Sequence, residues 1–344
     1  MVSFGLNRGS YVSVSETVGM SRWAEDHGFR TVWIGESGLA ASAIVHLTLA
    51  AANTRSISIG SAVLPYRTRN AALLAVTFKT LDDVAPNRMK MGLGAWWEPL
   101  ATRVGLPNTK PLTAMREIIT VVKRLLAGEV VSFDGEFVHV ADIRFDVPQD
   151  EAPRGYPVPV YVGAVGMKMM RLAGEIADGV LLNFLLPPSY TASAMDALRR
   201  GAEVAGRTVE SIDRPQFIVC SVDDHDPDRA VDEVREFLTR GIAQQPHIAE
   251  HCGADADLVA AVRAELGYPA TPAEVRRAMR LVPTSLVRGV SACGTASEAL
   301  EMIEAYVEGG CTEAVLTPVG RDPYATLEQL ASKAGLAHNQ GARS

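Results

Sequence analysis

The sequence has no long apolar run, few cysteines and no excess of positive charge. No apolar stretch approaches the roughly 20 residues that a membrane-spanning helix needs, and the first residues show no signal-peptide pattern. The four cysteines are widely spaced and form no CxxC pair, which favours free thiols in a reducing cytoplasm over disulfides. The net charge of -7 disfavours nucleic-acid binding. We therefore expect a cytoplasmic protein without a membrane or nucleic-acid partner.

Several catalytic signatures are also missing. The segment GAVGMK (Gly163–Lys168) has the wrong spacing for a Walker loop. Gly92-Leu-Gly94 lacks the third glycine of a dinucleotide fingerprint, and no GxSxG hydrolase motif occurs. The segment His247–His251 matches the HxxEH pattern of inverted zinc peptidases, but it follows Pro246 and has no clear third ligand. We expect a surface helix there and no metal site.

What the chain does contain is a long alternation of short β-like runs and helical patterns. Its 344 residues are 47% hydrophobic and 21% charged, enough apolar material for a large core. The expected strands are Val2–Leu6, Thr31–Ile34, Ser56–Leu64, Met89–Leu93, Val158–Val162, Val180–Leu182, Gln216–Ser221 and Glu313–Thr317. Eight strands, each followed by a helix, favour an α/β fold of the (β/α)8 TIM-barrel type over an open doubly wound sheet.

The whole chain, residues 1–344, is expected to form one barrel domain with a helical insertion. Residues 239–294 exceed the needs of one connection, and they contain helical pieces separated by Pro and Gly. We place this insertion after strand seven, above the active face or at a subunit contact. A smaller decoration, a hairpin around Asp134-Gly135, is expected after the fourth strand.

The most informative segment is a strand–turn–helix unit in the middle of the chain. The fifth strand ends in the turn Gly163, Ala164, Val165 and Gly166, and the helix Met167–Ile176 follows at once. Unpaired N–H groups at the start of a helix, together with the positive end of its dipole, suit a phosphate. The alternative is that both glycines only permit a tight turn.

The chain resembles the luciferase-like monooxygenase superfamily, and within it the branch that uses the deazaflavin coenzyme F420. It is most similar to the methylenetetrahydromethanopterin reductases. The motifs that carry the resemblance are Gly28–Ser37, Ile57–Gly94, Pro111–Glu129, Pro157–Asn183 and Gly310–Gly320. The resemblance implies a barrel with the cofactor at the carboxyl ends of the strands and its phosphate on Gly163–Gly166. It also implies a non-prolyl cis peptide at Ala62–Val63, a bulge in strand three that backs the cofactor ring.

Further candidates lie where barrel strands end, because working residues gather there. Glu36, after strand two, is the best acid candidate, since desolvation at an apolar mouth favours proton exchange; a salt bridge or helix cap is the alternative. Gly94 and Glu98 follow strand four, and Glu98 stands beside two tryptophans that would wall a planar ligand or only pack. Lys168 would counter a phosphate or polyglutamate charge, or be a solvated lysine.

Asn183, after strand six, would hydrogen-bond the cofactor, or instead cap the turn at Pro187. Arg67 and Arg69 would attract an anionic cofactor tail. Two departures from the family bear on proton transfer: several relatives have an Asp-His pair where this chain has Glu36-Ser37, and Glu98 lies one place beyond a glutamate that acts in some relatives.

The expected function is that of an F420-dependent oxidoreductase, which moves a hydride between reduced F420 and a small organic substrate. The alternatives are an FMN-dependent monooxygenase on the same fold, and a non-catalytic flavin-binding protein. The substrate is not identified by the sequence. Relatives are commonly dimers, so a homodimer is expected.

Overall fold

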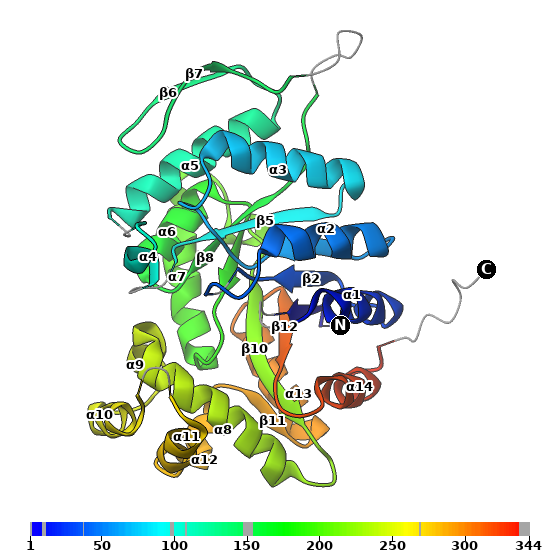
Figure 1. Cartoon of the computed structure of the whole chain (residues 1–344), viewed down its shortest axis with the longest axis vertical. Helices are drawn as coiled ribbons and strands as arrows, with labels where there is room; N and C mark the ends of the chain where they lie inside the picture. Colours follow the sequence, from blue (N-terminus) through cyan, green and yellow to red (C-terminus); the bar gives the residue numbers. More distant parts are fainter. Residues whose placement is uncertain are drawn as a thin grey trace, which may run out of the picture. The chain divides into compact units, whose positions relative to one another are not determined.

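The computed structural model describes residues 2–8, 12–36, 38–96, 100–106, 109–146, 154–267 and 270–336 (Figure 1). The strands are β1 (Phe4–Arg8), β2 (Thr31–Ile34), β3 (Ser58–Ser61), β4 (Leu64–Pro65), β5 (Met89–Gly94), β6 (Val131–Asp134), β7 (His139–Ile143), β8 (Val160–Ala164), β9 (Gly179–Leu182), β10 (Pro215–Val222), β11 (Ala292–Gly294) and β12 (Glu313–Pro318). The larger helices are α1 (Val14–Asp26), α2 (Ala43–Asn53), α3 (Ala71–Val84), α5 (Pro111–Leu126), α6 (Met167–Ile176), α7 (Pro188–Val204), α8 (Pro227–Gln244), α13 (Ala296–Glu308) and α14 (Pro323–Lys333). The shorter helices are α4 (Leu100–Arg103), α9 (Pro246–His251), α10 (Ala256–Glu265), α11 (Pro272–Met279) and α12 (Thr284–Gly289).

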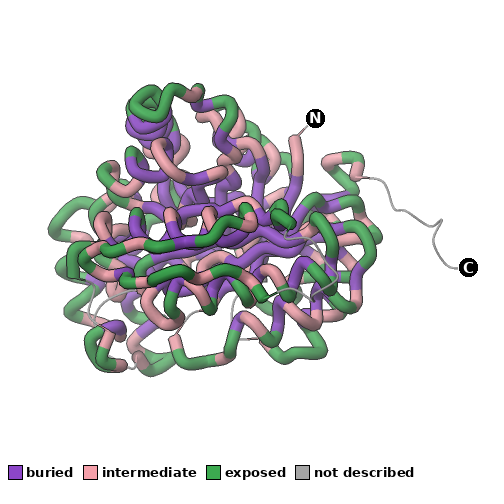
Figure 2. The backbone as a smooth tube through the Cα atoms, turned by 90° about the horizontal axis from the view of Figure 1, so that it is seen from above, coloured by how far each residue is buried: buried purple, intermediate pink, exposed green. Residues whose placement is uncertain are grey.

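The expected (β/α)8 barrel is confirmed. The sheet runs in the order β11-β10-β12-β1-β2-β3-β5-β8-β9, and an additional pairing joins β10 to β9. The eight strands expected from the sequence correspond to β1, β2, β3, β5, β8, β9, β10 and β12, and the short strands β4 and β11 join the same sheet. Strands β2, β5, β9 and β10 are buried along their whole length, and Figure 2 colours the buried parts of the backbone purple and the exposed parts green.

The chain divides into two compact units. The N-terminal unit comprises Leu6–Leu181 and Asp196–Asp213, and the C-terminal unit comprises Met1–Gly5, Leu182–Met195 and Arg214–Ser344. A single domain over residues 1–344 therefore stays a prediction. Within the described residues, no helix is both long and apolar enough to cross a bilayer.

Local sequence explains where the helices begin. Ser13 and Glu16 form a reciprocal capping box at α1, and Asn70 caps α3 by accepting a hydrogen bond from the Leu73 N–H at 2.8 Å. An Asn directly before a helical pattern is the sequence signal for such a cap. Each cap satisfies backbone N–H groups that the first turn of its helix would otherwise leave without an acceptor.

The hairpin β6–β7 is held to α5 by one buried carboxylate. Glu117 accepts hydrogen bonds from the backbone N–H groups of Glu136, Phe137 and Val138 at 2.9, 2.7 and 3.1 Å. Gly135 is required in this turn because a Cβ atom there would lie 2.5 Å from the carboxylate. Burial alone would raise the pKa of Glu117, but the three N–H donors outweigh it and lower that pKa.

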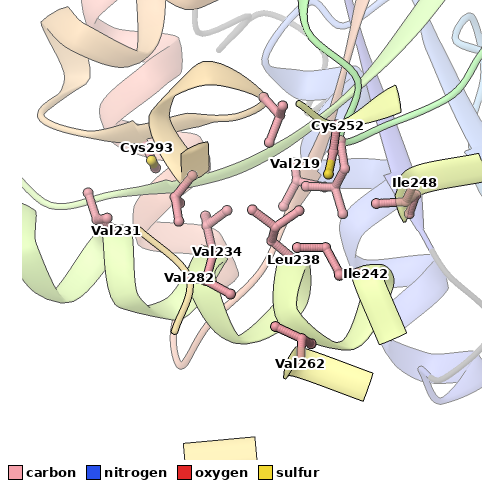
Figure 3. Close-up of a cluster of buried hydrophobic side chains, with 13 residues drawn as sticks. Val219, Val231, Val234, Leu238, Ile242, Ile248, Cys252, Val262, Val282 and Cys293 are labelled. Carbon is pink, nitrogen blue, oxygen red and sulfur yellow. The ribbon is translucent and has the colours of Figure 1, made fainter. Parts of the chain in front are cut away.

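The predicted insertion, residues 239–294, is largely helical and packs against α8 as one apolar cluster (Figure 3). The buried members drawn there include Val219, Val231, Val234, Leu238, Ile242, Ile248, Cys252, Val262, Val282 and Cys293.

Both predicted limits of the insertion need correction. Helix α8 continues to Gln244, and β11 pairs with β10 in the sheet, so the end of the predicted insertion is a barrel-sheet strand. A three-residue strand is too short to show a period-two pattern.

Candidate cofactor site at the carboxyl ends of the strands

The carboxyl ends of β2, β3, β5 and β8 lie at one edge of the N-terminal unit. Neighbouring strands are parallel, with Ile34 opposite Ser61 and Leu93 opposite Val162. A predicted site residue lies at or just after the end of each strand: Glu36 after β2, Val63 after β3, Gly94 at the end of β5 and Gly163 near the end of β8. This edge is where a parallel barrel presents its working side chains.

A non-prolyl cis peptide joins Ala62 to Val63, as the resemblance implied. It lies between β3 and β4 and interrupts the ladder between β3 and β5. There the Ser61 hydroxyl replaces the backbone pairing: it donates to the Gly92 carbonyl at 2.8 Å and accepts from the Gly92 N–H at 2.7 Å. The ladder resumes when β4 pairs with β5. The predicted bulge in strand three is therefore present, with Ala62 and Val63 both partly exposed.

The Val63 side chain occupies a seat made by two glycines on the next strands. A Cβ atom at Gly94 would lie 2.4 Å from Val63 Cγ2, and one at Gly163 would lie 2.7 Å from Val63 Cγ1. Real Cβ atoms essentially never come this close to another heavy atom. Both positions therefore need glycine because the bulge projects a branched side chain over them.

This seat corrects the interpretation of Gly163 as a turn residue. The apolar pattern predicted that the fifth strand ends at Val162, but β8 extends to Ala164. Gly163 and Ala164 are thus strand residues, and Val165 and Gly166 form the turn. The apolar pattern could not reveal this, because a glycine inside a strand looks like the end of one.

The start of α6 keeps the properties of an anion seat. Gly166 is the N-cap and provides no side-chain cap, and a Cβ atom placed on it would meet nothing within 4 Å. Its carbonyl accepts from the N–H groups of Met169 and Met170, while the N–H groups of Met167 and Lys168 have no acceptor inside the helix. Lys168 is exposed in that turn. The geometry is compatible with the predicted phosphate site, which stays a prediction.

Glu36 is held by an ion pair and does not stand in the apolar setting that was expected. Arg69 donates to its two carboxylate oxygens at 2.9 and 3.2 Å, and the Ala43 N–H at the start of α2 donates to it at 3.3 Å. The Glu36 side chain is 12% exposed. The Glu36 N–H also donates to the Val63 carbonyl at 3.2 Å, so the ion pair is tied to the bulge. Of the two alternatives, the structure displays the salt bridge and the helix cap.

Of the other sequence candidates, Arg67 contacts residues of its own chain. Arg67 lies over the rings of Tyr66 and Phe137, at 5.3 and 4.9 Å from their centroids, and its guanidinium contacts Thr109. It is therefore engaged within the chain. Glu98 lies outside the described residues, so its proposed part in catalysis stays a prediction.

Asn183 belongs to the C-terminal unit and follows β9. Its Nδ2 atom lies 2.8 Å from His247 Nε2, its Oδ1 accepts from the Phe184 N–H at 2.9 Å, and its carbonyl accepts from Gln216 at 2.7 Å. Burial, with the nearby charge of His251, lowers the pKa of His247 to about 4. Sequence reasoning missed this pair, although HxxEH had marked His247 as unusual.

The C-terminal unit also contains a cavity of about 790 Å³ beside α8. Arg229, Glu233 and Phe237 of α8 line it together with Met279 and the segment Val319–Arg321 that follows β12. Its wall is mostly charged, and Glu233 is fixed by Arg229 at 2.6 Å. Within the described residues, no group of three or more potential metal ligands occurs.

Comparison with known proteins agrees with this geometry. The luciferase-like monooxygenase family matches residues 2–313. A 5,10-methylenetetrahydromethanopterin reductase from Methanolobus tindarius is 30% identical over 87% of this chain and 89% of its own. An F420-dependent glucose-6-phosphate dehydrogenase from Kineococcus radiotolerans is 29% identical over 90% of this chain and 88% of its own. The solved F420-dependent tetrahydromethanopterin reductase of Methanopyrus kandleri superposes with a TM-score of 0.85 at 26% identity, covering 98% of this chain and 99% of that one. The chain belongs to the luciferase-like monooxygenase family.

Proposed function

We propose that the chain is an F420-dependent oxidoreductase that transfers a hydride between the reduced deazaflavin and a small organic substrate. The observation that carries the proposal is the Val63 side chain seated on Gly94 and Gly163, close to the start of α6, where the N-cap Gly166 provides no side-chain cap. The named F420 enzymes among the relatives support the choice of cofactor.

The described residues fit such a cofactor. The first-turn N–H groups after Gly166, with Lys168 nearby, would bind its phosphate. Ala62 and Val63 would support one face of its ring and leave the other face to the substrate. Asn183 would donate a hydrogen bond to it. When bound, the reduced deazaflavin supplies a hydride from its C5 carbon, and the protein supplies position and electrostatics.

Proton exchange with the substrate has two candidate carboxylates, Glu36 and Glu98. A guanidinium bound to both carboxylate oxygens occupies the positions from which Glu36 would deliver a proton. We therefore assign Glu36 first to holding the bulge and propose Glu98 for proton exchange.

The choice of cofactor is tested by titrating the purified protein with F420 and with FMN. We expect saturable F420 binding, followed by turnover of reduced F420 with a panel of organic acceptors. Tight FMN binding without F420 binding would favour the alternative monooxygenase. F420 binding without turnover across a broad panel would favour a non-catalytic flavin-binding protein.

We also propose a homodimer, and the packed pair α2 and α3 offers a surface for a second copy. Helix α2 contains no Asp, Glu, Lys or Arg. The outer face of the pair exposes Val45, Leu73, Val76 and Val84, with exposed fractions of 50%, 58%, 44% and 44%. The face is largely apolar, with the Lys79–Asp83 ion pair toward the C-terminal end of α3, and such a face is suited to a two-fold contact with itself. A location in the cytoplasm stays a prediction.

Replacing Leu73 and Val76 by Glu is expected to convert the dimer to a monomer, because two desolvated carboxylates would oppose their copies across the two-fold axis. Light scattering during gel filtration measures the mass. Val204→Glu is the matched control, since Val204 is 59% exposed outside this face and its variant should stay dimeric. A monomeric wild-type protein contradicts the dimer, and a dimeric double variant contradicts the location.

A further inference from the structure

The loop between β9 and α7, residues 183–187, has a conformation that its own sequence does not favour. Leu185 has a φ of 59°, in the left-handed region that costs a non-glycine residue about 1 kcal/mol or more. Its side chain is fully buried. It packs toward α8 and α9, since a Cβ atom at Gly241 would lie 3.2 Å from Leu185 and 3.1 Å from Ile248. Burial against these two helices therefore holds the loop.

Helix α9 also determines how the Asn183 amide is oriented. The Phe184 N–H donates to Asn183 Oδ1 at 2.9 Å, which places the Asn183 NH2 group toward His247. An NH2 group can only donate, so Nε2 of His247 must be an unprotonated acceptor, with the proton on Nδ1. A flipped amide would set two N–H donors against each other at Phe184. The hydrogen bond between Asn183 and His247 therefore requires a neutral imidazole.

The second histidine of α9 lies at the other end of the same loop. The His251 ring lies 5.1 Å from the ring of Tyr190, in the first turn of α7. His247 and His251 are four residues apart, so both imidazoles project from one face of the helix. The loop is fixed further where the Tyr306 hydroxyl donates to the Leu186 carbonyl at 2.6 Å.

We infer that α9 acts as a clip, meaning that it holds residues 183–187 in place, and that His247 is a positioning residue for Asn183. The HxxEH pattern then serves to hold a loop at both ends. One donor hydrogen of the Asn183 NH2 group is used by His247, and the second is left for a ligand. This last step rests on the proposed function, whereas the clip itself does not.

The test compares His247→Leu, which removes the acceptor, with His247→Gln, whose side-chain oxygen can accept the same hydrogen bond. His139→Leu is the control, because His139 lies on the exposed hairpin strand β7. Hydrogen exchange at the Phe184 amide reports the loop directly. F420 titration and separate determination of kcat and KM report Asn183.

We expect His247→Leu to speed Phe184 exchange at least tenfold and to weaken F420 binding about 3- to 10-fold, the effect of one lost hydrogen bond. His247→Gln should stay within about twofold of wild type in both. Equal behaviour of the Leu and Gln variants, or unchanged exchange in the Leu variant, overturns the inference. If the wild type binds no F420, the proposed function fails while the exchange measurement still decides the clip.

Discussion

Gly163→Ala is expected to weaken F420 binding at least tenfold and to destabilise the fold. The new methyl group would lie 2.7 Å from Val63 Cγ1, so the side chain that supports the proposed ring must move. Overpacking of this kind typically costs about 1–3 kcal/mol. F420 titration and denaturant unfolding measure the two effects separately.

The companion change Val63→Ala should restore the stability that Gly163→Ala costs. With Cγ1 gone, the nearest atoms to the new methyl are the Leu93 carbonyl oxygen at 3.7 Å and Val63 Cβ at 3.8 Å, which are ordinary contacts. For Gly94→Ala, rescue by Val63→Ala should be only partial, because Val63 Cβ would still lie 3.1 Å away.

A suitable control is Gly289→Ala, since a Cβ atom there meets nothing within 4 Å. This variant should unfold at the wild-type denaturant concentration or slightly above it. If Gly163→Ala is equally harmful with Val or Ala at position 63, the seat does not explain why glycine is required.

Arg69→Met is expected to lower the free energy of unfolding by about 2–3 kcal/mol. Breaking a fully buried pair costs about 3–5 kcal/mol, and we discount this because the Arg69 and Glu36 side chains are 24% and 12% exposed. The loss reflects a carboxylate left without its guanidinium and a bulge left without its anchor. Urea unfolding at neutral pH measures it. Arg199→Met removes an exposed pair with Asp196 and should cost less than about 1 kcal/mol.

Glu36→Gln separates anchoring from proton transfer. The amide still accepts from the Ala43 N–H, so we expect a smaller loss of stability than in Arg69→Met and little change in kcat. A fall in kcat of about a hundredfold or more at unchanged stability is the effect of removing a general acid. That result would contradict the anchoring role and return Glu36 to proton exchange.

The sequence predicted the barrel because its signals are local. Strand β2 coincides with the predicted Thr31–Ile34, and Asn70 marks the start of α3, since each depends on a few adjacent residues. The short elements β4, β11 and α4 were missed, because two to four residues cannot show a period.

The site was only partly predictable. The Ala62–Val63 cis bond was placed by the family motif, since no periodicity distinguishes a cis peptide. The requirement for glycine at 94 and 163 depends on a side chain 31 and 100 residues earlier in the chain, and only folding brings them together. The Glu36–Arg69 pair could not be predicted for the same reason, because its partners are 33 residues apart in the chain. A salt bridge or a helix cap was the alternative to an acid role for Glu36. For His247, the HxxEH spacing correctly indicated a shared helix face, but the expected surface helix gave no reason to pair His247 with Asn183.

The division of the chain into two units bears on its biosynthesis. Every residue of the N-terminal unit lies between positions 6 and 213, whereas the C-terminal unit needs residues up to its last helix. Chains fold progressively as they leave the ribosome. The N-terminal unit, which contains the Val63 seat, can therefore form its own contacts while residues 214–344 are still being translated. A nascent chain truncated after residue 213 would then already resist a protease in this unit.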